Sequence, residues 1–251
     1  MNRLPGIATT APKELDKKEI KAQTETLLQE LVGLQNLLYA ESKHAVLVVL
    51  QGMDASGKDG VIRDVFSRMN PQGVRVQSFK VPTEEELAHD FLWRIHHHAP
   101  ARGMLQVFNR SHYEDVLVTR VHGWCDDATA QKRFTAINAF ENLLQQHNRT
   151  QVLKFYLHIS AEEQQARLRE RVENPEKRWK YNPNDEKEAA LRDRYLEMYE
   201  EVFEHCNAIP WTIVPADQNW YKEYIVARQV VETLRGLNMK FPEVNLASKE
   251  A

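Results

Sequence analysis

The stretch VVLQGMDASGKDGVIRDVF, at Val48–Phe66, combines an apolar β-branched run, a glycine loop and an amphipathic segment. Within it, Gly52 and Gly57 are five positions apart and Lys58 follows directly. This spacing matches the phosphate-binding signature G-x-x-x-x-G-K-[ST], except that Asp59 takes the place of the serine or threonine. The stretch therefore predicts a strand, a phosphate-binding loop and a helix, in that order.

The loop has the chemistry that an anion requires. Its two glycines permit backbone angles closed to other residues, so successive N–H groups can turn toward one phosphate. The positive end of the following helix adds to the same place. We expect the phosphate chain to be cradled by Gly52, Ala55, Ser56, Gly57, Asp59 and Gly60. Lys58 would act on the phosphoryl group itself.

Strand-like and helix-like segments alternate along the rest of the chain. Strands are predicted at 45–51, 74–79, 104–109, 152–159 and 211–216, and helices at 13–39, 58–69, 84–97, 127–147, 161–172, 185–205 and 220–237. The alternation predicts an α/β fold, a five-stranded parallel sheet with helices on both faces. Ligands of such sheets bind at the carboxyl ends of the strands.

The chain divides into three parts. Residues 1–42 are expected to form an N-terminal arm and a helix, with 1–12 mobile; 43–240 form the main domain, with a helical lid at about 161–190; and 241–251 form a tail. The leucines at 27, 31, 34 and 38 share one helical face. Packing on the domain's own core is the favoured interpretation of this stripe, and a subunit interface is the alternative.

Bulk composition limits the possible functions. The 251 residues are 42% hydrophobic and 27% charged, as in ordinary soluble proteins, and no run approaches a membrane span. The first residues lack the apolar core of a secretory signal. Cys125 and Cys206 lie far apart, which favours reduced thiols in a cytoplasmic protein. A net charge of −3 argues against a nucleic-acid-binding protein.

The end of the third predicted strand reads VFNRSHYEDVLVTRVHG, residues 107–123. Asn109 and Arg110 stand where ligands are expected, and a buried guanidinium needs a phosphate or a carboxylate as its partner. Ser111 and Glu114 have the spacing of a helix capping box, which is a purely structural explanation of Ser111 and of part of the role of Glu114. Asp115 lies in the first helical turn and is a candidate metal ligand.

The segment RLRERVENPEKRWK, residues 167–180, contains six basic and three acidic residues. It is either a solvated helix with internal ion pairs or a lid that closes over phosphates. The candidate phosphate ligands in it are Arg167, Arg171, Arg178 and Lys180. Lys80 and Arg120 could extend the same basic channel, which would suit a long linear polyanion.

Five motifs taken together resemble the polyphosphate kinase 2 family: GMDASGKDG, NPQGVRVQSFKVPT, AHDFLWRIHHHAPARG, FNRSHYEDVLVTRV and PWTIVPAD. The form NRSHYEDV is most similar to its class III branch. The resemblance spans about residues 43–237 and implies a thymidylate-kinase-like P-loop fold, with phosphoryl transfer between inorganic polyphosphate and a nucleotide. It implies catalytic roles for Asp54, Lys58, Arg110, Glu114 and Asp115, and it favours the lid interpretation, with Arg171 acting in transfer.

The sequence therefore predicts direct in-line transfer of the terminal phosphoryl group of polyphosphate to AMP or ADP, giving ADP or ATP. Mg²⁺ or Mn²⁺ is the expected cofactor, held by Asp54 and Asp115, although Asp54 could instead cap the loop. A homo-oligomer, dimer or tetramer, is expected. Two alternatives remain: an ATP-dependent nucleoside or nucleotide kinase, and a non-catalytic sensor of nucleotide or polyphosphate.

Overall fold

The computed structural model describes residues 3–243 and contains a five-stranded sheet in the order β2-β3-β1-β4-β5, with every pairing parallel. The strands are β1 Ala45–Gln51, β2 Val74–Ser78, β3 Leu105–Asn109, β4 Thr150–His158 and β5 Trp211–Pro215. β1 is buried along its whole length because β3 and β4 pair with its two edges and helices cover both faces of the sheet. The predicted parallel sheet is confirmed, with strand ends shifted by two residues at most.

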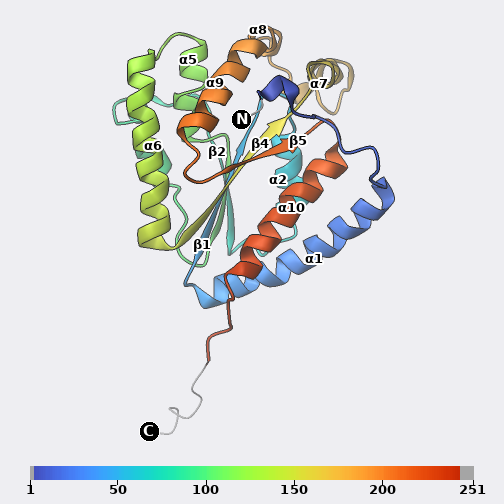
Figure 1. The fold of residues 1–251 in the computed structure, drawn as a ribbon, viewed down its shortest axis with the longest axis vertical. Helices are drawn as coiled ribbons and strands as arrows, with labels where there is room; N and C mark the ends of the chain where they lie inside the picture. Colours follow the sequence, from blue (N-terminus) through green and yellow to red (C-terminus); the bar gives the residue numbers. More distant parts are fainter. Residues whose placement is uncertain (1–2, 244–251) are drawn as a thin grey trace.

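Helices cover both faces of the sheet (Figure 1). One face carries α1 Lys17–Glu41, α2 Lys58–Phe66 and α10 Asn219–Gly236, and the other carries α5 Val118–Val121, α6 Asp127–Asn148 and α9 Arg192–His205. The predicted lid consists of α7 Ala161–Glu173, a 3-10 turn η3 Arg178–Lys180 and α8 Asp185–Ala190. In Figure 1, α7 and α8 lie beyond the carboxyl ends of the strands. Within residues 3–243, no helix is both long and apolar enough to span a bilayer.

The leucine stripe of α1 faces the molecule's own interior. Leu31 and Leu38 are buried, and Leu27 and Leu34 pack partly buried against the same core. α1 runs alongside α10 of the same chain (Figure 1). The interpretation of the stripe as part of the domain core is confirmed, and the stripe gives no support to a subunit interface.

The prediction of a mobile N-terminal arm is wrong. Leu4, in the short turn η1 Leu4–Gly6, is 1% exposed and belongs to the hydrophobic core. The backbone N–H of Leu4 donates to Glu200 on α9 (2.7 Å), and Thr9 Oγ1 donates to Asp217 after β5 (2.7 Å). These contacts bind the arm across the domain. Part of the predicted tail, residues 244–251, lies outside the described residues.

Two predicted helices are each divided in the structure. The segment 84–97 forms α3 Glu84–Leu87 and α4 Trp93–His96 instead of one helix. Between them, Asp90 Oδ1 accepts a hydrogen bond from the N–H of Leu92 (2.9 Å), a local turn that competes with helical bonding. The segment 185–205 forms α8 and α9, which are separated at Leu191.

Candidate active site

The glycine loop adopts the conformation that its sequence predicts. Gly57, the residue before α2, has φ +97°, and Gly52 has φ +151°. A Cβ at Gly52 would lie 2.8 Å from the carbonyl oxygen of Leu157, so the approach of β4 leaves no space for a side chain. α2 begins at Lys58, and the loop therefore ends at a helix N-terminus, as a phosphate cradle requires.

Lys58 folds back over the loop. Its Nζ donates to the carbonyl oxygens of Gly52 (2.7 Å) and Met53 (3.1 Å). The side chain is buried, and this burial, together with the nearby charge of Arg110, lowers its pKa to about 8. The loop thus holds Lys58 in a fixed position, with its charge at the centre of the site.

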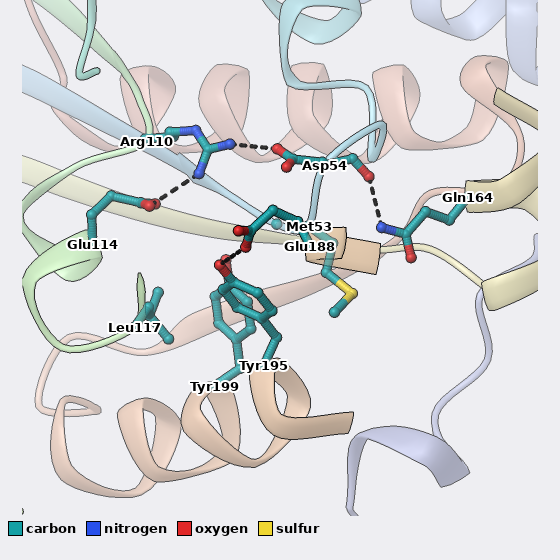
Figure 2. Close-up of a pocket in the computed structure, with 10 residues that line it drawn as sticks. Met53, Asp54, Arg110, Glu114, Leu117, Gln164, Glu188, Tyr195 and Tyr199 are labelled. Carbon is teal, nitrogen blue, oxygen red and sulfur yellow. Dashed lines mark hydrogen bonds and ion pairs between the residues drawn. The ribbon is translucent and has the colours of Figure 1, made fainter. Parts of the chain in front are cut away.

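Arg110 joins the loop to the end of β3. Its guanidinium forms ion pairs with Asp54 and with Glu114 (Nη1–Oε2, 3.0 Å), as Figure 2 shows. Burial raises the pKa of Asp54, but the charges of Arg110, Lys58 and Arg171 outweigh it and hold that pKa below its usual value. The carboxylate of Asp54 is therefore ionised and held at the edge of the loop.

The capping-box explanation of Ser111 and Glu114 is only half right. Ser111 Oγ accepts a hydrogen bond from the N–H of Tyr113 (3.2 Å), within the 3-10 turn η2 His112–Asp115. The carboxylate of Glu114 bonds to Arg110 and not to the start of the turn. Glu114 is thus free of the capping role and belongs to the charged site.

A groove of about 860 Å³ runs over the loop and beneath the lid. Within the described chain it is lined by nine basic side chains, Lys58, Arg63, Lys80, Arg110, Arg167, Arg171, Lys177, Lys180 and Lys222, and by five acidic ones, Asp54, Asp59, Glu163, Glu170 and Glu176. It also contains the predicted residues Ala55, Gly57, Gly60 and Asn109. In a chain of net charge −3, this local excess of positive charge indicates an anionic ligand.

Asp59, the departure from the loop signature, connects three parts of the groove. Lys180 of the lid forms an ion pair with its Oδ2 (3.0 Å), and Asn109 Nδ2 at the end of β3 donates to its Oδ1 (2.9 Å). Arg171, also in the lid, pairs with Asp185 of α8 (2.7 Å). One ion pair therefore joins the lid to the loop, and the other joins α7 to α8 within the lid.

Arg167 binds the backbone of the glycine loop. All five of its N–H groups have acceptors, so it has no donor left for a ligand. The acceptors are Glu163 Oε1 and the carbonyl oxygens of Ala55, Ser56, Ala216 and Asp217, at 2.8–3.2 Å. Although it lines the groove, this arginine fixes the loop backbone against the end of β5, in contrast to the predicted role in phosphate binding.

A second, small cavity shares Asp54 and Arg110 with the groove and is also lined by Gly52 and Glu114 (Figure 2). Glu188 of α8 faces it, and its Oε2 accepts a hydrogen bond from the hydroxyl of Tyr195 (2.6 Å). Arg110 thus lines both the basic groove and a cavity that contains three carboxylates, those of Asp54, Glu114 and Glu188.

Four of the predicted residues line neither the groove nor the small cavity. In η2, successive side chains point about 120° apart, so Asp115 does not share the direction of Glu114. Burial raises the pKa of Asp115 to about 6, although Arg133 and Arg94 act in the opposite direction. Asp54 lines both the groove and the small cavity, whereas Asp115 lines neither of them.

The other three have different surroundings. Arg120 is buried between Asp127 (2.7 Å) and Glu201 (2.8 Å), which satisfy its charge away from the groove. Arg178 is exposed and donates to the carbonyl of Val172 (2.9 Å). Ser56 is buried inside the loop, and its Oγ has no hydrogen-bond partner among residues 3–243.

Sequence reasoning missed Lys222. It stands in α10, more than 160 positions from the loop, yet it lines the groove and its Nζ contacts the position that a Cβ on Gly57 would occupy. Nζ donates to Asn219 Oδ1, and burial lowers its pKa to about 8. A signal existed: Lys222 shares the buried face of α10 with Val226 and Val230 at four-residue spacing. A lysine inside an apolar stripe needs an anionic partner or a ligand.

These features define the class of protein. A glycine loop between the central strand and a helix, under a basic groove and a helical lid, is a P-loop kinase-like site for phosphate chains. The model of the polyphosphate kinase 2 (PPK2) family matches residues 14–242, and the chain belongs to this family.

Similar proteins agree with this assignment. An AMP/ADP-polyphosphate phosphotransferase of Meiothermus ruber is 52% identical over 226 residues, 89% of this chain and 84% of the relative. An ADP-polyphosphate phosphotransferase of Rhodopseudomonas palustris is 42% identical over 239 residues, 90% of this chain and 82% of the relative. The crystal structure of polyphosphate kinase 2 from Arthrobacter aurescens superimposes with a TM-score of 0.94 at 40% identity, covering 98% of this chain and 89% of that one. These similarities do not favour an ATP-dependent nucleoside kinase.

Proposed function

We propose that the protein transfers the terminal phosphoryl group of inorganic polyphosphate to AMP or ADP. The observation that carries the proposal is the groove over the loop, in which basic side chains outnumber carboxylates along a path suited to a linear polyanion. The names of the similar enzymes from Meiothermus and Rhodopseudomonas, AMP/ADP- and ADP-polyphosphate phosphotransferase, support the same pair of substrates.

The transfer needs no general base. The attacking oxygen belongs to a nucleotide phosphate and is already anionic near neutral pH. It forms a new bond to the terminal phosphorus of the chain while the bond to the preceding phosphate breaks. The electron pair of the broken bond stays with the shortened chain. The site therefore has to position two anions and stabilise their charge.

The main obstacle is electrostatic repulsion between the substrates. Two unit charges ~4 Å apart repel by about 4 kcal/mol at an effective dielectric of 20. Lys58, fixed by the loop carbonyls, and the lid cations Arg171 and Lys180 would offset this repulsion. Arg110, held between two carboxylates, would contact the transferred group. Arg167 would keep the loop N–H groups in place.

Asp54 fits a magnesium ligand, since its carboxylate is ionised and lines the groove. Mg²⁺ commonly takes one or two protein carboxylates and completes its shell with substrate phosphates and water. Residues 3–243 contain no cluster of three or more acidic, histidine or cysteine side chains that could hold a metal alone, so phosphate oxygens would have to contribute. When bound, Mg²⁺ or Mn²⁺ would neutralise part of the phosphate charge.

The test is an assay without ATP. The protein is incubated with polyphosphate, Mg²⁺ and either AMP or ADP, in separate reactions, and the nucleotides are separated by chromatography. New ADP or ATP in the presence of polyphosphate, and none with the Lys58→Ala variant, is the expected result. Binding of polyphosphate by calorimetry without any product would refute the transfer and indicate a sensor.

A further inference from the structure

A buried polar cluster lies beneath η2, outside both cavities. It joins Lys154 of β4, Glu141 of α6, and His112 and Tyr113 of η2. Glu141 Oε2 pairs with Lys154 Nζ (2.8 Å), and Glu141 Oε1 bonds to the hydroxyl of Tyr113 (2.7 Å) and to His112 Nε2 (3.2 Å). Lys154 Nζ also donates to the hydroxyl of Tyr113 (2.9 Å). A strand and a helix thus hold two successive residues of η2.

The burial of this cluster is unusually complete for charged groups. Each of the four residues is at most 1% exposed. Burial raises the pKa of Glu141, but His112 and Lys154 outweigh it and hold that pKa below its usual value. Burial lowers the pKa of His112, which is therefore neutral near pH 7. Replacing a buried ion pair by apolar residues is often neutral or stabilising, so stability alone does not account for this one.

Two residues of the cluster lie close in sequence to a strained backbone position, Arg110. Arg110 has φ +63°, a left-handed conformation that is strained for a residue other than glycine. Such a conformation persists when the surrounding structure over-determines it. On one side, the N–H of Arg110 donates to the carbonyl of Leu50 in β1 (3.0 Å). On the other side, His112 and Tyr113 fix the backbone two and three residues further on.

We propose that Glu141 and Lys154 are positioning residues, which hold η2 so that Arg110 pairs with both Glu114 and Asp54 at the transfer site. This inference rests on the proposed function, since the reaction is what the positioned arginine serves. Neither residue touches a substrate. The pair acts through the backbone of η2 on the guanidinium of Arg110.

The test compares three variants with the wild type. Glu141→Leu/Lys154→Met removes both charges at similar volume, and Tyr113→Phe removes only the bridging hydroxyl. Gln35→Met is the matched control, since Gln35 is a buried polar residue of α1 that bonds to the N–H of Asn70, away from the site. Thermal unfolding, kcat and KM for polyphosphate and for ADP are measured for each.

Displacing a catalytic group by about 1 Å can lower the reaction rate roughly 100-fold. We therefore expect kcat to fall at least tenfold in the double variant and about threefold in Tyr113→Phe, with KM changed less than threefold. Gln35→Met keeps its kcat. The decisive measurement combines each cluster variant with Arg110→Lys. The effects of mutations at residues that act through one another are not additive, so a cluster mutation added to Arg110→Lys should lower kcat by less than about twofold further.

Three results would overturn the inference: unchanged kcat in both cluster variants, effects that multiply with Arg110→Lys, or an Arg110→Lys variant as active as the wild type. If the double variant does not fold, Tyr113→Phe decides the question alone. A wild-type protein without polyphosphate-dependent transfer is a different result, because it refutes the proposed function before any variant is compared.

Discussion

Replacement of Lys222 by methionine should raise stability and weaken substrate binding together. Lys222 is 1% exposed, and its ammonium group has Asn219 as its hydrogen-bond partner among the described residues. Its pKa falls from 10.5 to about 8 in the folded chain, chiefly because of burial and then because of Arg167. At 1.36 kcal/mol for each pKa unit, the buried charge costs about 3 kcal/mol.

The sign of the effect depends on pH. Below pH 8 the lysine is protonated in both the folded and unfolded states, so the whole cost is present. Between pH 8 and 10.5 the unfolded chain binds more protons, and the wild type gains stability as pH rises. Lys222→Met should therefore be more stable than the wild type by up to about 3 kcal/mol at pH 7, and this advantage should disappear by pH 10.5.

Function should change in the opposite direction. An ammonium beside the loop favours a bound polyanion, and its loss should raise KM for polyphosphate roughly tenfold, equivalent to about 1.4 kcal/mol. Urea unfolding at pH 7 and at pH 10, with initial rates at varied polyphosphate, measures both effects. Lys18→Met, at an exposed position of α1, is the control and should change neither. A methionine variant that is less stable at pH 7, or that keeps the wild-type KM, would refute the reasoning.

Other perturbations address the rest of the site. Lys58→Ala should lower kcat by about 10²–10³ while circular dichroism shows an intact fold, because a charge fixed by the loop is lost; near-normal turnover would remove the loop from the reaction. EDTA should abolish transfer and added Mg²⁺ or Mn²⁺ should restore it, and transfer in metal-free buffer would exclude the proposed role of Asp54. Asp115→Asn should keep kcat within about threefold, since Asp115 lies outside the groove. The pKa of Asp115 is raised to about 6 in the folded protein, so the unfolded chain loses this proton at a lower pH than the folded chain does. As pH rises from about 4 to 6, the wild type should therefore lose stability relative to Asp115→Asn, as measured by thermal unfolding.

The sequence predicts what depends on local pattern. The glycine loop, the five strands and the position of Arg110 at the end of β3 follow from spacing and residue type. Contacts that join distant segments do not follow. Nothing near Arg167 indicates that its donors are consumed by loop carbonyls, and the anchoring of Leu4 depends on α9, almost two hundred positions away.

Local turns explain the remaining errors in the sequence-based predictions. The spacing of apolar residues in 84–97 matches a helix, yet the turn at Asp90 breaks it and leaves Leu87 exposed. Adjacent carboxylates at 114 and 115 look equivalent in the sequence, but a 3-10 turn directs one to Arg110 and the other into the protein.

The ion pair between Asp59 and Lys180 has a consequence for how substrates enter and leave. Asp59 already offers the lid an anionic oxygen, as a phosphate would. A phosphate that bound Lys180 would therefore have to displace the carboxylate of Asp59, and after its release Lys180 could pair with Asp59 again. The ion pair with Asp59 would therefore reduce the net gain in free energy when Lys180 binds a phosphate, and it would lower the cost of releasing that phosphate by the same amount.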